Sequence, residues 1–174
     1  MNRNVAYFKM PKCASTTIQI CFENYENLFF YHNYEEFLSD IEIDKKNCLK
    51  FTTVRNPYQR AISSWQHCLK EKWIEKISLL DFLKFDYKLR NETILYSMPQ
   101  TTYIKELLKN DINFVIKIEN LIDEFKKFLP SVKITNNYNV NTKEKYNLSN
   151  IEKEKIEEIF KDDFIFLKYK SNED

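Results

Sequence analysis

Short apolar runs alternate with segments of helical pattern along the first 130 residues. The runs are rich in Val, Ile, Leu, Phe and Tyr, a composition that favours strands. The predicted strands are 5–10, 28–31, 49–54 and 113–118. In residues 34–41, apolar positions recur three and four apart, as on one face of a helix. The predicted helices are 17–24, 34–41, 58–73, 78–108 with an interruption near Met98 and Pro99, and 121–129.

Residues 131–148 are polar and rich in Asn, which predicts an extended surface loop. Ser149 and Glu152 have the spacing of a capping box, ahead of a charged helix running to about Phe160. The aromatic segment 164–167 closes the chain. No repeat or linker is visible, so we expect one domain over 1–174. Alternating strands and helices predict an α/β fold with a mainly parallel central sheet flanked by helices.

Composition removes several classes of function. The 27 Lys and Arg residues against 26 Asp and Glu leave a net charge of +1, which gives no general reason to expect nucleic-acid or membrane binding. The chain has no glycine, which excludes Walker A and Rossmann fingerprints and leaves left-handed turn positions to Asn or Asp. Four cysteines without a C-x-x-C pair and two histidines predict no metal site. The thiols are expected to be mostly buried, in a cytoplasmic protein with no membrane span or signal peptide.

A hydroxyl-rich segment, Pro11-Lys-Cys-Ala-Ser-Thr-Thr17, joins the first predicted strand to the first predicted helix. Ligands of parallel sheets bind beyond the C-terminal ends of the strands, and the free N–H groups that begin a helix attract anions. Lys12 adds a charge, and Ser15, Thr16 and Thr17 add donors for a phosphate-like group. Ordinary helix capping by Ser or Thr accounts for the same residues, so both interpretations stay open at this point.

A second polar segment, Val54-Arg-Asn-Pro-Tyr-Gln-Arg-Ala-Ile-Ser-Ser-Trp65, follows the third predicted strand. Arg55 ends that strand, and Ser63 lies eight residues further, about two helical turns. Arg is the natural fork for a terminal phosphate. A surface ion pair for Arg55 and a hydroxyl packed against its own helix for Ser63 are the structural alternatives.

Together the two segments resemble the nucleotide-binding signatures of sulfotransferases that use 3′-phosphoadenosine 5′-phosphosulfate (PAPS). The first segment is most similar to the carbohydrate branch, of the heparan sulfate 2-O-sulfotransferase type, which also lacks a glycine in this loop. The resemblance implies a P-loop-NTPase-like sulfotransferase fold. It also implies that 11–17 binds the 5′-phosphosulfate and that Arg55 and Ser63 bind the 3′-phosphate. In residue terms, the nucleotide contacts are Lys12, Cys13, Ala14, Ser15, Thr16, Thr17, Arg55 and Ser63.

Weaker parts of the resemblance lie further along the chain. Phe30-Tyr-His-Asn33 resembles the family's Tyr-His segment, which implies that His32 is the catalytic base. Glu23, Glu35 and Glu36 are alternative bases. Residues 114–121 resemble a family strand that ends in Glu-Asn-Leu. Residues 139–145 resemble a late basic loop that closes over the cosubstrate, which implies contacts from Lys143 and Lys145. Gln100 occupies a place where some relatives have a polar residue on the acceptor side.

The reaction implied is in-line transfer of a sulfuryl group from PAPS to a hydroxyl of a glycan or other sugar, leaving 3′-phosphoadenosine 5′-phosphate (PAP). His32 accepts the hydroxyl proton, Lys12 stabilises charge on the leaving phosphate, and no metal is required. The family's long acceptor-binding insertions are missing, so the acceptor stays open. Two alternatives remain: a P-loop-like kinase for a small hydroxyl substrate, and an inactive domain that binds PAP or another nucleotide.

Overall fold

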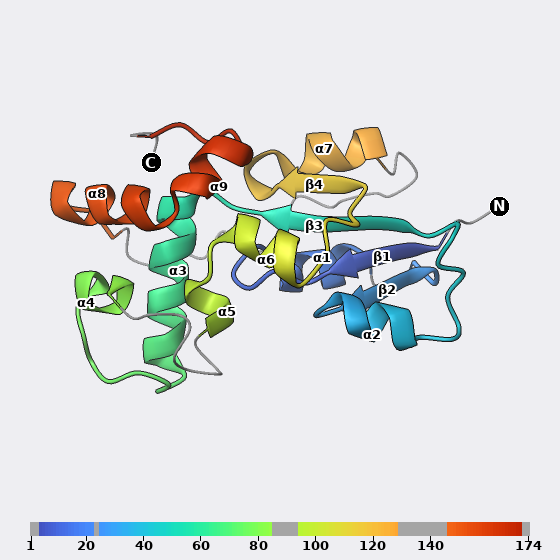
Figure 1. Ribbon diagram of the computed structural model, residues 1–174, viewed down its shortest axis with the longest axis horizontal. Coiled ribbons are helices and arrows are strands. Elements are labelled where there is room, and N and C mark those ends of the chain that lie inside the picture. Colours follow the sequence, from blue (N-terminus) through green and yellow to red (C-terminus); the bar gives the residue numbers. More distant parts are fainter. Residues whose placement is uncertain (1–3, 23–24, 85–93, 129–145, 172–174) are drawn as a thin grey trace. The chain divides into compact units, whose positions relative to one another are not determined.

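The computed structural model describes residues 4–22, 25–84, 94–128 and 146–171 (Figure 1). The chain divides into two compact units, each held together by its own internal contacts. The first comprises residues 1–54 and 104–141, and the second comprises residues 55–103 and 142–174. The expectation of one domain over 1–174 stays a prediction.

The first unit is built on a four-stranded sheet in which every strand is parallel to its neighbours (Figure 1). The spatial order is β2 (Leu28–Tyr31), β1 (Val5–Phe8), β3 (Leu49–Val54) and β4 (Phe114–Lys117). Val5 of β1 lies opposite Leu28 of β2 and Leu49 of β3. The prediction of an α/β fold with a parallel sheet flanked by helices is confirmed.

Helices cover both faces of this sheet. Successive side chains of a strand point to opposite faces, so the apolar run of β1 has to be buried on both sides. Tyr7 of β1 packs in one cluster with Ile18 of α1 (Ser15–Cys21) and Phe125 of α7 (Leu121–Phe128). Phe8, the next residue, instead contacts Phe37 of α2 (Tyr34–Ser39), with ring centroids 5.6 Å apart. The four residues of β1 are therefore all buried, which explains why the strand is a continuous apolar run and not an alternating one.

The second unit is helical over its described residues. Its helices are α3 (Pro57–Lys70), α4 (Leu79–Leu83), α5 (Ile94–Ser97), α8 (Asn150–Ile159) and α9 (Lys161–Phe166). The boundary between the units falls within α6 (Gln100–Glu106). Tyr58, Leu79, Ile156 and Phe164 belong to the core that α3, α4, α8 and α9 share.

Helix ends follow the capping chemistry of the sequence. Asn56 caps α3 through hydrogen bonds from the N–H groups of Tyr58 and Gln59, and Pro57 occupies the first turn. The predicted capping box of Ser149 and Glu152 is present at the start of α8. Asn33 caps α2.

Several predicted boundaries are wrong. The first helix begins at Ser15, two residues before its predicted start, and the predicted helical region 78–108 contains three short helices in its described part. Pro99 precedes α6, as expected of a residue that cannot continue a preceding helix. Of the predicted loop at 131–148, residues 131–145 lie outside the described residues. Within the described residues, none of the helices has the length and apolar character that crossing a bilayer demands.

Candidate functional site

The strand order places a change of winding direction between β1 and β3. The connection after β1 leads to β2 on one side of the sheet, and β4 lies beyond β3 on the other side. Open parallel sheets bind ligands outside the C-terminal ends of the strands at such a point. The segment that leaves β1 at this position is 9–14, which contains the first half of the predicted anion loop.

The backbone of this loop is left-handed at two residues that carry a β-carbon. Lys12 has φ 63° and Ala14 has φ 65°. A non-glycine residue in this region costs about 1–2 kcal/mol, so the surrounding structure has to impose the conformation. The expectation that Asn or Asp would take such positions is largely wrong. Among the described residues, those with positive φ are Lys12, Ala14, Lys72, Lys109, Asn110 and Lys168.

A buried chain of hydrogen bonds holds the loop against the sheet. The Thr53 hydroxyl of β3 donates to the carbonyl oxygen of Cys13 at 2.5 Å. Because that hydroxyl has one proton, it must accept from the Tyr7 hydroxyl of β1, whose oxygen lies 2.8 Å away. Tyr7, Thr53 and Cys13 are all completely buried. Two neighbouring strands therefore fix the carbonyl that lies between the left-handed residues Lys12 and Ala14.

The start of α1 differs from ordinary hydroxyl capping. Ala14 is the N-cap, and no side chain caps the helix, so the capping interpretation of this segment is wrong. The hydroxyl residues Ser15, Thr16 and Thr17 form the first turn; Thr16 is exposed, and the other two are half-buried. Lys12 is half-buried as well. The segment that follows β1 thus carries three hydroxyl donors and the ammonium group of Lys12.

His32 directly follows β2, the strand beside β1. Its side chain is 64% exposed, and its Nδ1 lies 3.3 Å from Oε2 of Glu36. The backbone N–H of His32 also donates to that oxygen, at 2.7 Å. Glu36 therefore contacts both the backbone N–H and the ring of His32. The carboxylate of Glu35, another alternative base, is exposed and lies 4.0 Å from Lys109 Nζ. The third alternative, Glu23, lies outside the described residues.

Arg55 is bonded to the last residue of β3 and begins the second unit. Its backbone N–H donates to Gln100 Oε1 at 2.8 Å, and its carbonyl accepts from Gln100 Nε2 at 2.8 Å. Its guanidinium donates to Gln59 at 3.3 Å. Gln100 is completely buried, so its predicted place on the acceptor side does not describe its role here. Gln100 binds the Arg55 backbone.

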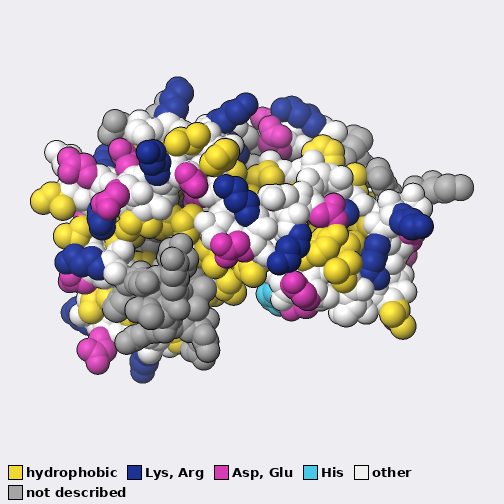
Figure 2. Space-filling view, viewed as in Figure 1, with side chains coloured by type: hydrophobic (Ala, Val, Ile, Leu, Met, Phe, Trp, Pro, Cys, Tyr) yellow, Lys and Arg dark blue, Asp and Glu magenta, His cyan; other side chains and the backbone are white. Residues whose placement is uncertain are grey.

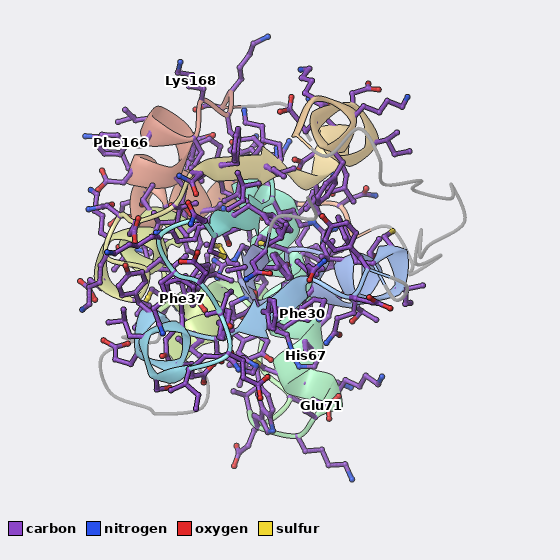
Figure 3. The ribbon with its side chains drawn as sticks, turned by 90° about the vertical axis from the view of Figure 1, so that its right-hand side faces the viewer. Phe30, Phe37, His67, Glu71, Phe166 and Lys168 are labelled. Carbon is purple, nitrogen blue, oxygen red and sulfur yellow. The ribbon has the colours of Figure 1, made fainter. Side chains whose placement is uncertain are left out.

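The other predicted residues of this half lie on α3 or outside the described chain. Ser63 is half-buried on α3, and its neighbour Ser64 is completely buried. His67, on the same helix and labelled in Figure 3, stacks on Tyr96 with ring centroids 5.0 Å apart. Lys143 and Lys145 lie outside the described residues.

Sequence reasoning missed Tyr7, Thr53 and Asp163, and it missed the contacts that Gln100 makes. Tyr7 and Thr53 are 46 positions apart, and Gln100 and Asp163, which hydrogen-bond each other, are 63 apart. A single sequence has no signal that pairs residues so distant. The only local signal is the pair of threonines, Thr52 and Thr53, in a buried strand end, because buried hydroxyls need hydrogen-bond partners.

Basic and acidic side chains are intermixed on the face of the molecule that Figure 2 shows. In the described part of the chain, no group of three or more His, Cys, Asp or Glu side chains is placed to hold a metal ion.

The protein thus has an α/β fold with a parallel sheet, and a loop with left-handed residues lies where the winding direction of the sheet changes. Comparison with protein-family models, curated proteins and solved structures finds no match for this chain.

Proposed function

We propose that this protein is a sulfotransferase that moves the sulfuryl group of PAPS to a hydroxyl of a carbohydrate acceptor. The observation that carries the proposal is the fixed left-handed loop around Lys12 at the C-terminal end of β1. A lysine in a rigid loop at this position suits a phosphate or sulfate group, whose charge it meets without reorganisation. The sequence resemblance supplies the choice of PAPS among such ligands.

In this proposal the loop 11–17 binds the 5′-phosphosulfate. Lys12 donates to the bridging oxygen, where negative charge grows as the leaving phosphate departs. Ser15, Thr16 and Thr17 donate to the non-bridging oxygens. Cys13 and Ala14 contribute backbone only, because the Cys13 side chain is buried and Ala14 has no donor in its side chain.

His32 is the proposed base. The acceptor oxygen attacks sulfur while the bond from sulfur to the phosphate oxygen breaks, and His32 Nε2 takes the hydroxyl proton. The products are a sulfate ester, PAP and the protonated imidazole. Glu36 orients the ring through Nδ1 and stabilises the imidazolium that forms, so its role is to position the base.

Arg55 and Ser63 are the proposed contacts for the 3′-phosphate. The guanidinium of Arg55 carries the charge and the paired donors that a terminal phosphate requires. Ser63 is the serine that the sequence resemblance assigns to this phosphate. It is half-buried, whereas its neighbour Ser64 is completely buried. The proposed contribution of Lys143 and Lys145 rests on the resemblance alone.

Titration calorimetry with PAP in the presence of EDTA tests the nucleotide site. We expect wild-type protein to bind PAP, and Arg55→Ala to weaken binding by about 1.5–3 kcal/mol, the value of a hydrogen bond to a charged group. Lys12→Ala should also weaken binding, whereas Lys9→Ala should not. Lys9 is a matched control because it is a lysine that directly follows the same strand. Its Nζ lies over the Phe30 ring, 5.4 Å from the ring centroid. Equal losses from Lys9→Ala and Lys12→Ala would point to general charge and not to a built site.

Turnover is tested with sulfur-labelled PAPS and a panel of sugar acceptors. Lys12→Ala and His32→Ala should each lower the rate by roughly 10²–10⁴-fold, the range for groups of this kind. Glu36→Gln should lower turnover while leaving the affinity for PAP unchanged. Binding of PAP without turnover on any acceptor would favour the inactive domain. Binding of ATP with Mg²⁺ in place of PAP would favour the kinase.

A further inference from the structure

We propose that Gln100 is a positioning residue that sets the backbone of Arg55 for phosphate recognition, an inference that rests on the proposed function. Both residues belong to the second unit. The Gln100 amide accepts from the Arg55 N–H and donates to the Arg55 carbonyl, each at 2.8 Å. This pair of bonds fixes the peptide groups on both sides of one α-carbon, as a neighbouring strand would.

The position of Gln100 is itself fixed by a buried carboxylate. Asp163 of α9 is completely buried and accepts from the backbone N–H of Gln100 at 2.9 Å and from Gln100 Nε2 at 3.3 Å. Its other oxygen accepts from the N–H and the hydroxyl of Thr101, both at 2.8 Å. Asp163 therefore satisfies the first two N–H groups of α6 and aims the Gln100 side chain at Arg55.

A second buried charge holds the segment that leads into α6. Arg60 is 1% exposed and donates to the carbonyl oxygens of Leu95, at 3.1 Å, and Met98, at 2.8 Å. The chain on the N-terminal side of Gln100 is thus anchored to α3, and Gln100 itself is anchored to α9. Arg55 lies two residues before α3, so its backbone is tied to the rest of the unit through α3 and through Gln100.

Such an arrangement has a function beyond packing. A buried carboxylate and a buried guanidinium are costly to desolvate. Asp163 and Arg60 are both buried, whereas Arg55 is half-buried and its guanidinium donates to the exposed Gln59. Fixing the Arg55 backbone reduces the freedom that its guanidinium loses when it binds an anion. Gln100 therefore acts on the ligand through Arg55, without touching it.

Amide hydrogen exchange tests the positioning role without any ligand. In Gln100→Met, which keeps the size of the side chain and removes both bonds, the Arg55 amide should exchange faster than in wild-type protein. Thr101→Val is the matched control, because it removes one bond to the same carboxylate and none to Arg55. Unchanged exchange at Arg55 in Gln100→Met, or equal acceleration in Thr101→Val, overturns the inference.

PAP binding then tests the functional consequence. Gln100→Met should raise the Kd for PAP roughly 5- to 30-fold, as expected when one or two hydrogen bonds that hold a binding group are lost. In the Arg55→Ala background the same substitution should change Kd by no more than about twofold, because its effect passes through Arg55. Thr101→Val should lower Tm and leave Kd unchanged. A purely structural role would instead weaken PAP binding equally in both backgrounds.

The two proposals fail in different ways. If wild-type protein does not bind PAP, the proposed function fails, and the exchange experiment still decides whether Gln100 fixes Arg55. If wild-type protein binds PAP and Arg55→Ala weakens it, but Gln100→Met binds like wild type, the proposed function stands and the positioning role is refuted.

Discussion

Thr53→Val is the sharpest test of how the loop around Lys12 keeps its left-handed backbone. The substitution replaces a completely buried hydroxyl by a methyl group of similar size. It removes the bond donated to the Cys13 carbonyl and the bond accepted from the Tyr7 hydroxyl. At about 0.5–1.5 kcal/mol net for each bond, the free energy of unfolding should fall by about 1–3 kcal/mol. Urea unfolding followed by circular dichroism measures this change.

Thr52→Val provides the control one residue earlier. Thr52 is also completely buried, and its hydroxyl donates to the carbonyl of Phe8 at 2.8 Å, within β1 and outside the loop. Its loss should cost about half as much stability as Thr53→Val and should leave PAP affinity unchanged. Thr53→Val should weaken PAP binding. Without the bond to the Cys13 carbonyl, Lys12 and Ala14 can leave the left-handed backbone conformation.

The double variant Tyr7→Phe, Thr53→Val separates the loop contact from the contact between strands. Its stability should exceed that calculated by adding the two single losses, since both partners of one bond are then removed. Equal stability and equal PAP affinity in Thr52→Val and Thr53→Val would refute the reasoning. The loop would then keep its conformation without the hydrogen bond from β3.

The hydroxyl groups of Ser64, Tyr34 and Ser149 each contribute to stability in a different way. Ser64→Ala should leave the free energy of unfolding unchanged or raise it by up to about 1 kcal/mol, because the Ser64 hydroxyl is buried with no hydrogen-bond partner among the described residues; Ser63→Ala should weaken PAP binding without this effect. The pKa of Tyr34 is raised to about 12, first by its hydrogen bond to Asp111 and then by burial. Its contribution to stability is therefore complete below pH 10 and is lost as the pH rises toward 12, so Tm should fall less over that interval in Tyr34→Phe than in wild type. Ser149→Ala should lower the free energy of unfolding by about 1 kcal/mol through loss of the capping box, as measured by urea unfolding.

The sequence predicted the elements of the sheet well where local pattern and burial agree. The ranges 28–31 and 49–54 match β2 and β3, because an apolar run rich in aromatic and β-branched residues has few other stable conformations. The capping box at Ser149 was equally visible, since its two partners lie three residues apart. Helix starts were predicted less well, as at Ser15, where the N-cap is an alanine held left-handed by distant contacts.

Burial of the thiols was also predictable from residue type. Cys13, Cys48 and Cys68 are buried and Cys21 is half-buried, and burial raises the pKa of the Cys21 thiol. The handedness of turns was not predictable from residue type. Lys12 and Ala14 take conformations that Asn or Asp adopt more easily, because the Thr53 hydroxyl and the buried Cys13 carbonyl decide the backbone there.

By itself, the sequence determined the alternation of strands and helices, the even charge, and which polar segments follow which strands. The charge is a sum over the residues, and the other two properties depend on neighbours within a few positions. Only the tertiary structure decided the order of the strands, the fixed carbonyl of Cys13, and the contacts of Gln100 with Arg55 and Asp163. Each of these joins residues at least 40 positions apart or depends on which strands are neighbours, and the buried polar groups involved find partners only when the chain is folded.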